Sequence, residues 1–278
     1  MQRADLHLHT TVSDGVLEPL ALVKACSALG LAAIAITDHD VTDGVEEAVA
    51  AGLKHGVEVI AGVEINTDHG PTEIHILGYG LNLADPGFQK TMTWLREGRV
   101  SRAREMVGLL RRLGAPVSWE RVQEISGRGA IGRPHLAEAL IEEGHVPSRA
   151  EAFIRYLGND GPAYVPRERF NAVEAIATIR GAGGVAVVAH PVKIGDDTLI
   201  PALVESGLGG IEAYHPDHSD EDAARYCRMA DQLGVVWTGG SDFHGNNESR
   251  PLACRTVPYS QVEALLAETQ RFRAELNH

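Results

Sequence analysis

Short apolar segments alternate with helical patterns along this chain, and this alternation constrains the fold more than any other feature. Amphipathic stretches such as residues 18–29 and 44–55 separate most of the apolar segments. The apolar run at residues 185–189 is typical of a parallel strand covered on both faces. The pattern predicts an α/β fold in two series of elements, with strands at residues 4–10, 31–37, 57–65, 73–79, 185–189, 210–214 and 235–239.

Strand signals disappear between the two series. Residues 86–169 instead carry amphipathic helical patterns, including residues 100–113 and 135–143. The sequence therefore predicts a discontinuous barrel domain at residues 1–85 and 170–278, interrupted by a helical insertion. A length of 278 residues suits one large α/β domain with such an insertion.

Charge is distributed unevenly along the chain. The formal net charge is −13, yet residues 96–133 hold nine arginines against four glutamates, which gives +5 locally and leaves −18 for the remainder. An anionic partner would be attracted by this local positive charge. A solvent-exposed helix face explains the arginines from Arg96 to Arg112 equally well.

Cysteine spacing and hydropathy indicate the cellular compartment of the protein. Cys26, Cys227 and Cys254 form no C-x-x-C pair, which favours a reducing compartment. The amino-terminal residues lack the basic and apolar regions of a signal peptide, and no apolar run reaches the length of about eighteen residues that suggests a membrane span. We expect a soluble cytoplasmic protein with no membrane partner.

Histidines and acidic residues gather at the ends of the predicted strands. His7 and His9 close the first strand, and Asp38 and His39 close the second. Residues i and i+2 of a strand point to the same side, so both side chains of an H-x-H motif reach one centre. The carboxyl ends of parallel barrel strands meet on one face, where residues distant in sequence converge. A lone H-x-H would indicate ordinary hydrogen-bonded histidines, but this set predicts a shared site.

These motifs resemble the four motifs of the PHP (polymerase and histidinol phosphatase) family, in the same order. They are His7-Leu8-His9 with Asp14, Thr37-Asp38-His39, Glu64 with His75, and Ser241-Asp242-Phe243-His244. The resemblance covers residues 4–79 and 171–245 and implies a distorted (β/α)7 barrel of PHP type with a helical insertion. It also implies a metal-dependent phosphoesterase whose nine metal ligands are His7, His9, Asp14, His39, Glu64, His75, His190, Asp242 and His244. Asp38 is expected to orient a ligand histidine.

The resemblance divides these ligands among up to three ions. The three groups are His7, His9, Glu64 and Asp242; Glu64, His75 and His190; and Asp14, His39 and His244. Glu64 would therefore bridge two ions. Mixed imidazole and carboxylate ligation suits Mn²⁺, Fe²⁺ or Zn²⁺ better than Ca²⁺. We expect two or three Mn²⁺ ions, with Fe²⁺ or Zn²⁺ as alternatives.

The expected reaction is in-line attack on phosphorus by a metal-bridging hydroxide, which forms near neutral pH because the ions lower the pKa of bound water. His7, His9, Glu64 and Asp242 are the expected catalytic ligands. His215, at another strand end, is a candidate proton donor to the leaving alkoxide. A supporting or packing role for His215 is equally compatible with the sequence.

The motif Gly132-Arg133-Pro134-His135 opens a predicted helix of the insertion, where backbone amides and a guanidinium can bind an anion. A PHP barrel with such an insertion resembles the branch that includes nucleoside 3′,5′-bisphosphate phosphatases and 5′-3′ exoribonucleases. This resemblance implies that Arg133 and His135 contact a second phosphate.

Three functions remain open at this point. The first is removal of the 3′-phosphate from nucleoside 3′,5′-bisphosphates, with short 5′-phosphorylated oligonucleotides, including short RNA, as a further substrate class. The second is a phosphatase for a small metabolite such as histidinol phosphate, and the third is a noncatalytic metal-bound interaction module. The basic insertion favours the first over the second, and the intact ligand set disfavours the third. The sequence does not predict an oligomeric state.

Overall fold

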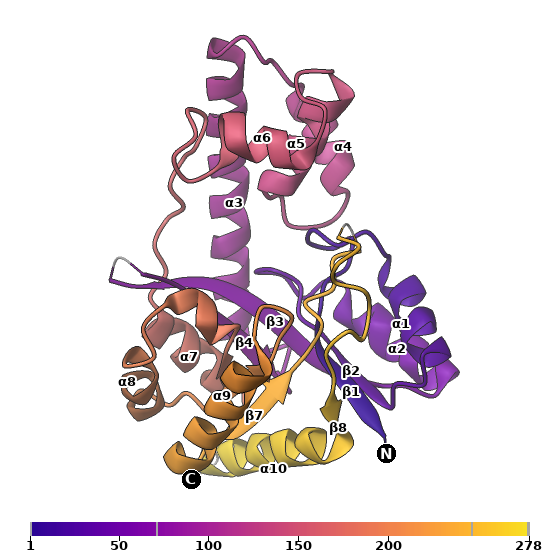
Figure 1. Cartoon of the computed structure of the whole chain (residues 1–278), viewed down its shortest axis with the longest axis vertical. Coiled ribbons are helices and arrows are strands. Elements are labelled where there is room, and N and C mark those ends of the chain that lie inside the picture. The colour runs from indigo at the N-terminus through magenta and orange to yellow at the C-terminus, as the bar shows by residue number, and fades with distance from the viewer. Residues whose placement is uncertain (1, 71, 246, 277–278) are drawn as a thin grey trace.

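The computed structural model describes residues 2–70, 72–245 and 247–276, and it shows a barrel with a helical insertion standing above it (Figure 1). The first half of the barrel comprises β1 (Arg3–Leu8), α1 (Pro19–Ala28), β2 (Ala33–Ile36), α2 (Val45–His55), β3 (Glu58–His69) and β4 (Thr72–Tyr79). The second half comprises α7 (Ala172–Gly181), β5 (Val185–Val188), the 3₁₀ helix η2 (Pro191–Ile194), α8 (Leu199–Glu205), β6 (Gly210–Tyr214), α9 (Asp220–Leu233), β7 (Val236–Gly239), β8 (Val257–Pro258) and α10 (Tyr259–Leu276).

The strands form one sheet in the order β7-β6-β5-β4-β3-β2-β1-β8. The sheet curls until the carboxyl end of β1 meets the segment after β7, where Leu8 and Phe243 form a parallel bridge and the His9 N–H donates to the Phe243 carbonyl at 3.1 Å. The two-residue strand β8 pairs with the start of β1 in antiparallel orientation. This nearly closed mixed sheet with helices around it confirms the predicted distorted barrel.

Strand β4 also runs against the direction expected for a parallel barrel. β4 is antiparallel to both β3 and β5, because β3 and β4 form a hairpin around residue 70 and a hairpin connection reverses the chain. The amino end of β4 therefore lies at the face where the other strands end. His75, near that end, reaches the common face from the opposite chain direction.

Helix α10 closes the end of the barrel away from the insertion (Figure 1). Its Leu265 and Phe272 pack against the buried Leu6 of β1 and Val187 of β5. Burying a large apolar side chain stabilises a fold by about 1.5–3 kcal/mol. The barrel interior at this end is thus a packed core, which leaves the opposite end for the polar residues.

The insertion consists of α3 (Pro86–Arg112), α4 (Trp119–Ser126), α5 (Arg133–Glu142), α6 (Arg149–Ala152) and the π-helix η1 (Phe153–Leu157). Helix α3 belongs to two cores. Its amino-terminal half places Phe88 and Met92 in the cluster that includes Ile176 of α7, whereas its carboxyl-terminal half places Met106 and Leu110 in a cluster built only from insertion residues. The division of the chain at residues 86 and 169 stays a prediction.

No helix within residues 2–70, 72–245 and 247–276 combines the length and the apolar character needed to cross a bilayer.

Candidate metal centre

Five histidine rings converge on the carboxylate of Glu64, which is 1% exposed in β3. Glu64 Oε2 lies 3.2 Å from each of His7 Nε2, His9 Nε2 and His39 Nδ1. Glu64 Oε1 lies 2.8 Å from His75 Nδ1 and 3.0 Å from His190 Nε2. These rings come from β1, the segments after β1, β2 and β5, and the amino end of β4, so the strand ends assemble the cluster.

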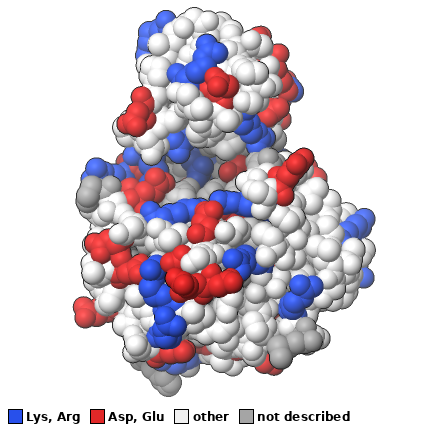
Figure 2. Space-filling view, in the orientation of Figure 1, with Lys and Arg blue, Asp and Glu red and all other residues white. Residues whose placement is uncertain are grey.

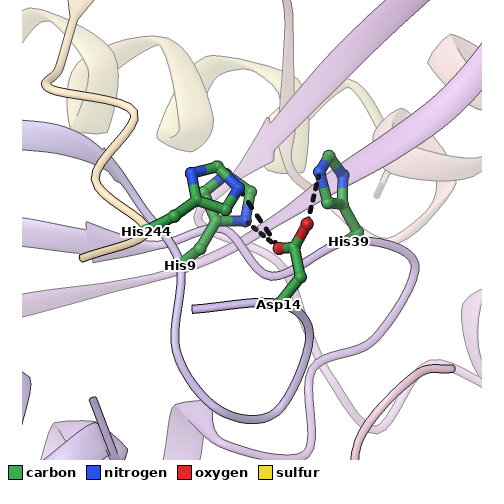
Figure 3. A group of neighbouring side chains, drawn as sticks. All are labelled: His9, Asp14, His39 and His244. Carbon is green, nitrogen blue, oxygen red and sulfur yellow. Dashed lines mark ion pairs between the residues drawn. The ribbon is translucent and has the colours of Figure 1, made fainter. Parts of the chain in front are cut away.

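Asp14 is the centre of a second group beside the first (Figure 3). Its Oδ1 lies 3.2 Å from His244 Nε2 and 3.8 Å from His9 Nδ1, and its Oδ2 lies 4.0 Å from His39 Nε2. His9 and His39 therefore present one ring nitrogen to Asp14 and the other to Glu64. The structure brings His9, Asp14, His39 and His244 close enough to share one ion.

Asp242 joins the cluster from the segment that follows β7. Its Oδ1 lies 3.5 Å from His7 Nε2 and 3.4 Å from His9 Nε2. Its other oxygen, Oδ2, lies 2.9 Å from an Arg250 guanidinium nitrogen and 3.2 Å from His215 Nε2. One oxygen thus faces the imidazoles while the other is held by donors.

Three non-glycine residues with positive φ lie beside this cluster. Asp40, His190 and Asp242 have φ values of 56°, 29° and 48°, and each follows the end of a barrel strand. Such conformations cost about 1–3 kcal/mol each and are retained where the surrounding structure enforces them. Here they turn the chain sharply at the barrel mouth.

The donor set fits divalent cations. Five imidazoles face a single carboxylate, which cannot satisfy them all. Within the described residues, both ring nitrogens of His9 and the Nδ1 atoms of His39 and His190 are buried without a hydrogen-bond partner. Buried polar groups left without partners are costly, and imidazole with carboxylate is a donor set that transition-metal ions accept.

The surroundings of the cluster favour the ionised form of its carboxylates. Burial opposes ionisation of Glu64, Asp14 and Asp242, but the neighbouring histidines lower the pKa of each carboxyl well below its usual value. Burial also opposes protonation of His9, yet Asp242 and Glu64 raise the pKa of His9 to about 10. The carboxylates and the imidazoles of the cluster therefore stabilise each other's charged forms.

A cleft of about 200 Å³ opens beside the cluster and is lined by both the barrel and the insertion. Figure 2 shows the molecule hollowed between these two parts, with Lys and Arg side chains at the hollow. The cationic side chains that line the cleft are Arg99, Arg102, Arg133 and Arg167. Burial and the charges of Arg133, Arg99 and Arg167 lower the pKa of Arg102 to about 10. Four carboxylates also line the cleft, those of Asp14, Asp40, Glu73 and Glu168. Because Arg99 pairs with Asp40 and Arg167 with Asp68, Arg102 and Arg133 are the better placed cations for an anionic ligand.

The two predicted substrate contacts lie in different settings. Arg133 lines the cleft and donates to Asn159 Oδ1 at 2.8 Å, with its guanidinium over the rings of Phe153 and Tyr164. His135 is buried, and its Nδ1 accepts the Gly132 N–H at 2.9 Å at the start of α5. This placement favours Arg133 as a ligand contact and gives His135 a part in holding the helix start. Both substrate roles stay predictions.

His215, the predicted proton donor, is fully buried beside Asp242. Its Nδ1 accepts the Asp217 N–H at 3.0 Å, so the ring hydrogen of the neutral form is on Nε2, which lies 3.2 Å from Asp242 Oδ2. Since both nitrogens are engaged, the geometry favours orientation of Asp242 over proton delivery. The predicted catalytic role has no support from these contacts.

The sequence led us to expect that Asp38 orients a ligand histidine, but the structure shows other partners for its carboxylate. Its Oδ1 accepts the Thr10 N–H at 2.8 Å and the Ser13 hydroxyl at 2.5 Å, and its Oδ2 accepts the Thr10 hydroxyl at 2.7 Å. The loop that carries Asp14 turns back toward the end of β2, so its Thr10 and Ser13 donors occupy the Asp38 carboxylate. Asp38 thus fixes a metal-site loop rather than a ring.

Several residues around the site were not found by sequence reasoning. Glu212 accepts a hydrogen bond from His7, and Arg250 and Lys193 lie against Asp242. One sequence signal could have identified Glu212: it lies two residues before the end of β6, and His215 directly follows that strand. Arg250 and Lys193 lie outside any motif, so only the fold identifies them.

Similarity to known proteins is consistent with this geometry. A family model described as the PHP domain matches residues 5–112. A 3′,5′-nucleoside bisphosphate phosphatase of Chromobacterium violaceum is 34% identical over 95% of this chain and 98% of its own length. The chain belongs to the PHP family.

Other members of the family extend the comparison. A 5′-3′ exoribonuclease of Haemophilus influenzae is 33% identical over 87% of this chain and 90% of its own length. The solved structure of a Bifidobacterium adolescentis protein, classed as a metal-dependent phosphoesterase, superposes with a TM-score of 0.89 at 31% identity over 96% of each chain. The predicted family and the predicted class of metal-dependent phosphoesterase are confirmed.

Proposed function

We propose that this protein is a metal-dependent phosphatase that removes the 3′-phosphate from nucleoside 3′,5′-bisphosphates and releases nucleoside 5′-monophosphates. One juxtaposition carries the proposal: the cluster around Glu64 lies beside a cleft whose lining includes Arg102 and Arg133. A bisphosphate needs one centre for the phosphate that is cleaved and separate positive charge for the phosphate that is retained. The name of the Chromobacterium violaceum relative supports this substrate.

The metal ligands in this proposal are the nine residues expected from the motifs. His7, His9, Glu64 and Asp242 form one group with ligand atoms within 4.8 Å of one another, and His9, Asp14, His39 and His244 form another. His75 and His190 face the remaining oxygen of Glu64. Two or three Mn²⁺ ions suit this set, with Fe²⁺ or Zn²⁺ as alternatives. Bound ions would activate water near neutral pH and neutralise charge on the phosphoryl oxygens.

The chain itself contributes binding and orientation. Arg133 and Arg102 would hold the retained 5′-phosphate, because guanidinium groups bind phosphate oxygens through paired hydrogen bonds. Burial and repulsion from Arg133 and its neighbouring arginines lower the pKa of Arg102 to about 10. A dianion bound beside Arg102 would relieve this repulsion. Holding one phosphate in the cleft orients the other toward the metal centre.

The proposal also includes a second substrate class and a cellular location. The cleft is bounded by the insertion, so short 5′-phosphorylated RNA is a further candidate substrate, as the name of the Haemophilus influenzae relative also suggests. Free thiols at Cys26, Cys227 and Cys254 suit the reducing cytoplasm.

Phosphate release from a panel of substrates tests the function. The panel is adenosine 3′,5′-bisphosphate, adenosine 3′-monophosphate, adenosine 5′-monophosphate, histidinol phosphate and a short 5′-phosphorylated RNA, each with added Mn²⁺. We expect the highest kcat/KM for the bisphosphate. Faster turnover of histidinol phosphate would replace the proposal with a metabolite phosphatase, and no turnover of any substrate by metal-loaded protein would indicate a binding module.

Arg133→Gln tests how the second phosphate is recognised. Hydrogen bonds to charged groups contribute about 1.5–3 kcal/mol, so KM for the bisphosphate should rise roughly 10- to 150-fold. The preference for the bisphosphate over adenosine 3′-monophosphate should fall by a similar factor, while metal content stays the same. Arg128→Gln is the matched control, because Arg128 lies in the insertion but its side chain is 84% exposed. An unchanged preference in Arg133→Gln would remove Arg133 from the site.

A further inference from the structure

Glu212 lies in the middle of β6 with no exposed surface and contacts two histidines of the cluster. We infer that Glu212 is a positioning residue that fixes the ring tautomer of His7 and the backbone of His190, so that both rings present a lone pair to the metal centre. The inference rests on the metal centre proposed above and is independent of the substrate.

The first contact is with the His7 ring. His7 Nδ1 lies 2.8 Å from Glu212 Oε1, and a carboxylate is an acceptor only, so Nδ1 carries the hydrogen. The lone pair of neutral His7 is then on Nε2. That atom faces the centre, 3.2 Å from Glu64 Oε2 and 3.5 Å from Asp242 Oδ1. A carboxylate that fixes a ligand histidine in this way also makes the ring a better donor to a metal.

The second contact is with the His190 backbone. The His190 N–H donates to Glu212 Oε2 at 2.6 Å. His190 has φ 29° and ψ 58°, outside the extended region, just after β5 ends at Val188. Glu212 therefore gives this amide a partner at the point where the chain turns. The turn aims the His190 ring at Glu64, with Nε2 3.0 Å from Oε1.

The ligand atoms of Glu212, His7 and His215 lie within 4.8 Å of one another, but the hydrogen bonds of Glu212 disfavour it as a metal ligand. Each of its oxygens already faces an N–H group, one on the His7 ring and one on the His190 backbone. A backbone N–H cannot be displaced by a cation without unpairing a buried amide. The His7 nitrogen bonded to Glu212 is also the one that does not face Glu64.

Glu212→Gln changes this contact without changing its size. The amide has one acceptor oxygen and one NH₂ donor, so it cannot accept from both N–H groups. If its oxygen stays with His190, its NH₂ faces His7 Nδ1 and moves the ring hydrogen to Nε2, which blocks the lone pair. In the opposite orientation, the His190 amide loses its acceptor.

Metal affinity of the full-length chain measures the effect without any substrate. Mn²⁺ and Zn²⁺ binding is followed by competition with a chromophoric chelator, and we expect roughly 10- to 100-fold weaker binding in Glu212→Gln. Glu205→Gln, an exposed carboxylate at the end of α8, is the matched control and should bind as the unsubstituted chain does. Thermal melts of the chelator-treated proteins give the folded fraction of each.

The tautomer provides a second readout that a packing role would not change. In Zn²⁺-loaded protein with ¹⁵N-labelled histidine, the His7 hydrogen should be on Nδ1 in the unsubstituted chain, and this signal should be lost in Glu212→Gln. Unchanged affinity with an unchanged tautomer would overturn the inference, as would a loss of binding that only follows the unfolded fraction. If the unsubstituted chain binds no metal, the metal centre and this inference fail together. If it binds metal but releases no phosphate from the bisphosphate, only the substrate proposal fails.

Discussion

The ion pair between Arg99 and Asp40 is predicted to dock the insertion onto the barrel. Arg99 of α3 donates through Nε to Asp40 Oδ2 at 2.7 Å, and its Nη2 lies 2.5 Å from the same oxygen. The Asp40 side chain is 4% exposed and that of Arg99 is 18% exposed, so water screens the pair weakly. Asp40 immediately follows His39, so this pair connects the insertion to a predicted metal ligand.

The expected loss of stability depends on the hydrogen bonds that Asp40 keeps when Arg99 is replaced. Breaking a buried ion pair from one side costs about 3–5 kcal/mol. Asp40 keeps the Asn66 backbone N–H and side-chain NH₂, each at 3.0 Å. We therefore expect Arg99→Met to cost about 2–3 kcal/mol, somewhat less than that range. With an unfolding entropy of about 0.6 kcal/mol per kelvin for a chain of this length, Tm should fall by about 3–5 °C.

Calorimetry of the chelator-treated proteins at neutral pH tests this value. Arg111→Met is the control, since Arg111 lies on the same helix but is exposed, and its Tm should change by less than about 1 °C. Adding Asp40→Asn to Arg99→Met should restore part of the loss, because it removes the uncompensated charge and asparagine tolerates the positive φ of this position. Equal Tm values for Arg99→Met and Arg111→Met, or additive losses in the double variant, would refute the reasoning.

The same pair predicts a pH dependence. Burial opposes ionisation of Asp40, but Arg99 and Asn66 lower the pKa of its carboxyl below the usual value of 3.8. A carboxyl whose pKa is depressed by folding stabilises the protein above the unfolded-state pKa and loses that contribution as the pH falls through the folded-state pKa. The Tm difference between the unsubstituted chain and Arg99→Met should be constant near neutral pH and shrink below about pH 4.

Three further predictions concern the fold and the metal centre. Ser219→Ala should lower Tm by about 2 °C, because the Ser219 hydroxyl accepts the Asp222 N–H at the start of α9 and loss of such a cap costs about 1 kcal/mol. Gly240→Ala should lower both Tm and metal affinity, since its Cβ would lie 2.3 Å from the His7 backbone nitrogen where the barrel closes; Gly181→Ala, with nothing within 4 Å, is the control and should not destabilise. Mn²⁺ at about 100 times its Kd should stabilise the chain by about 2.7 kcal/mol per site, and an unchanged melt after chelation would contradict a metal centre.

Much of the barrel could be predicted because its signals are local. The apolar run of β5 and the helical pattern of α2 each reflect a periodicity within a few residues. The metal-ligand motifs were equally local, since His7 and His9 share a strand face whatever the rest of the chain does. The direction of β4 was not predicted, because a periodicity of two is the same in parallel and antiparallel strands.

The arginines show why the substrate site was harder to predict. Arg99 and Arg111 lie on one helix in similar sequence surroundings, but Arg99 lines the cleft and Arg111 faces solvent. That distinction depends on how α3 is rotated against the barrel. A charge count could establish that the segment is basic but could not identify the side chains that reach the cleft.

The sequence by itself indicated the kinds of element present and the motifs that carry imidazoles and carboxylates, because both are patterns within short stretches. The grouping of these residues around shared ions was implied by the family resemblance. The folded molecule alone decided that Glu212 sits behind His7 and that Arg250 holds Asp242. Those contacts join residues 205 and 8 positions apart in sequence, and neither pair belongs to a recurring pattern. Contacts of this kind depend on how the elements pack and where the chain reverses direction. A pattern within a few residues does not contain that information.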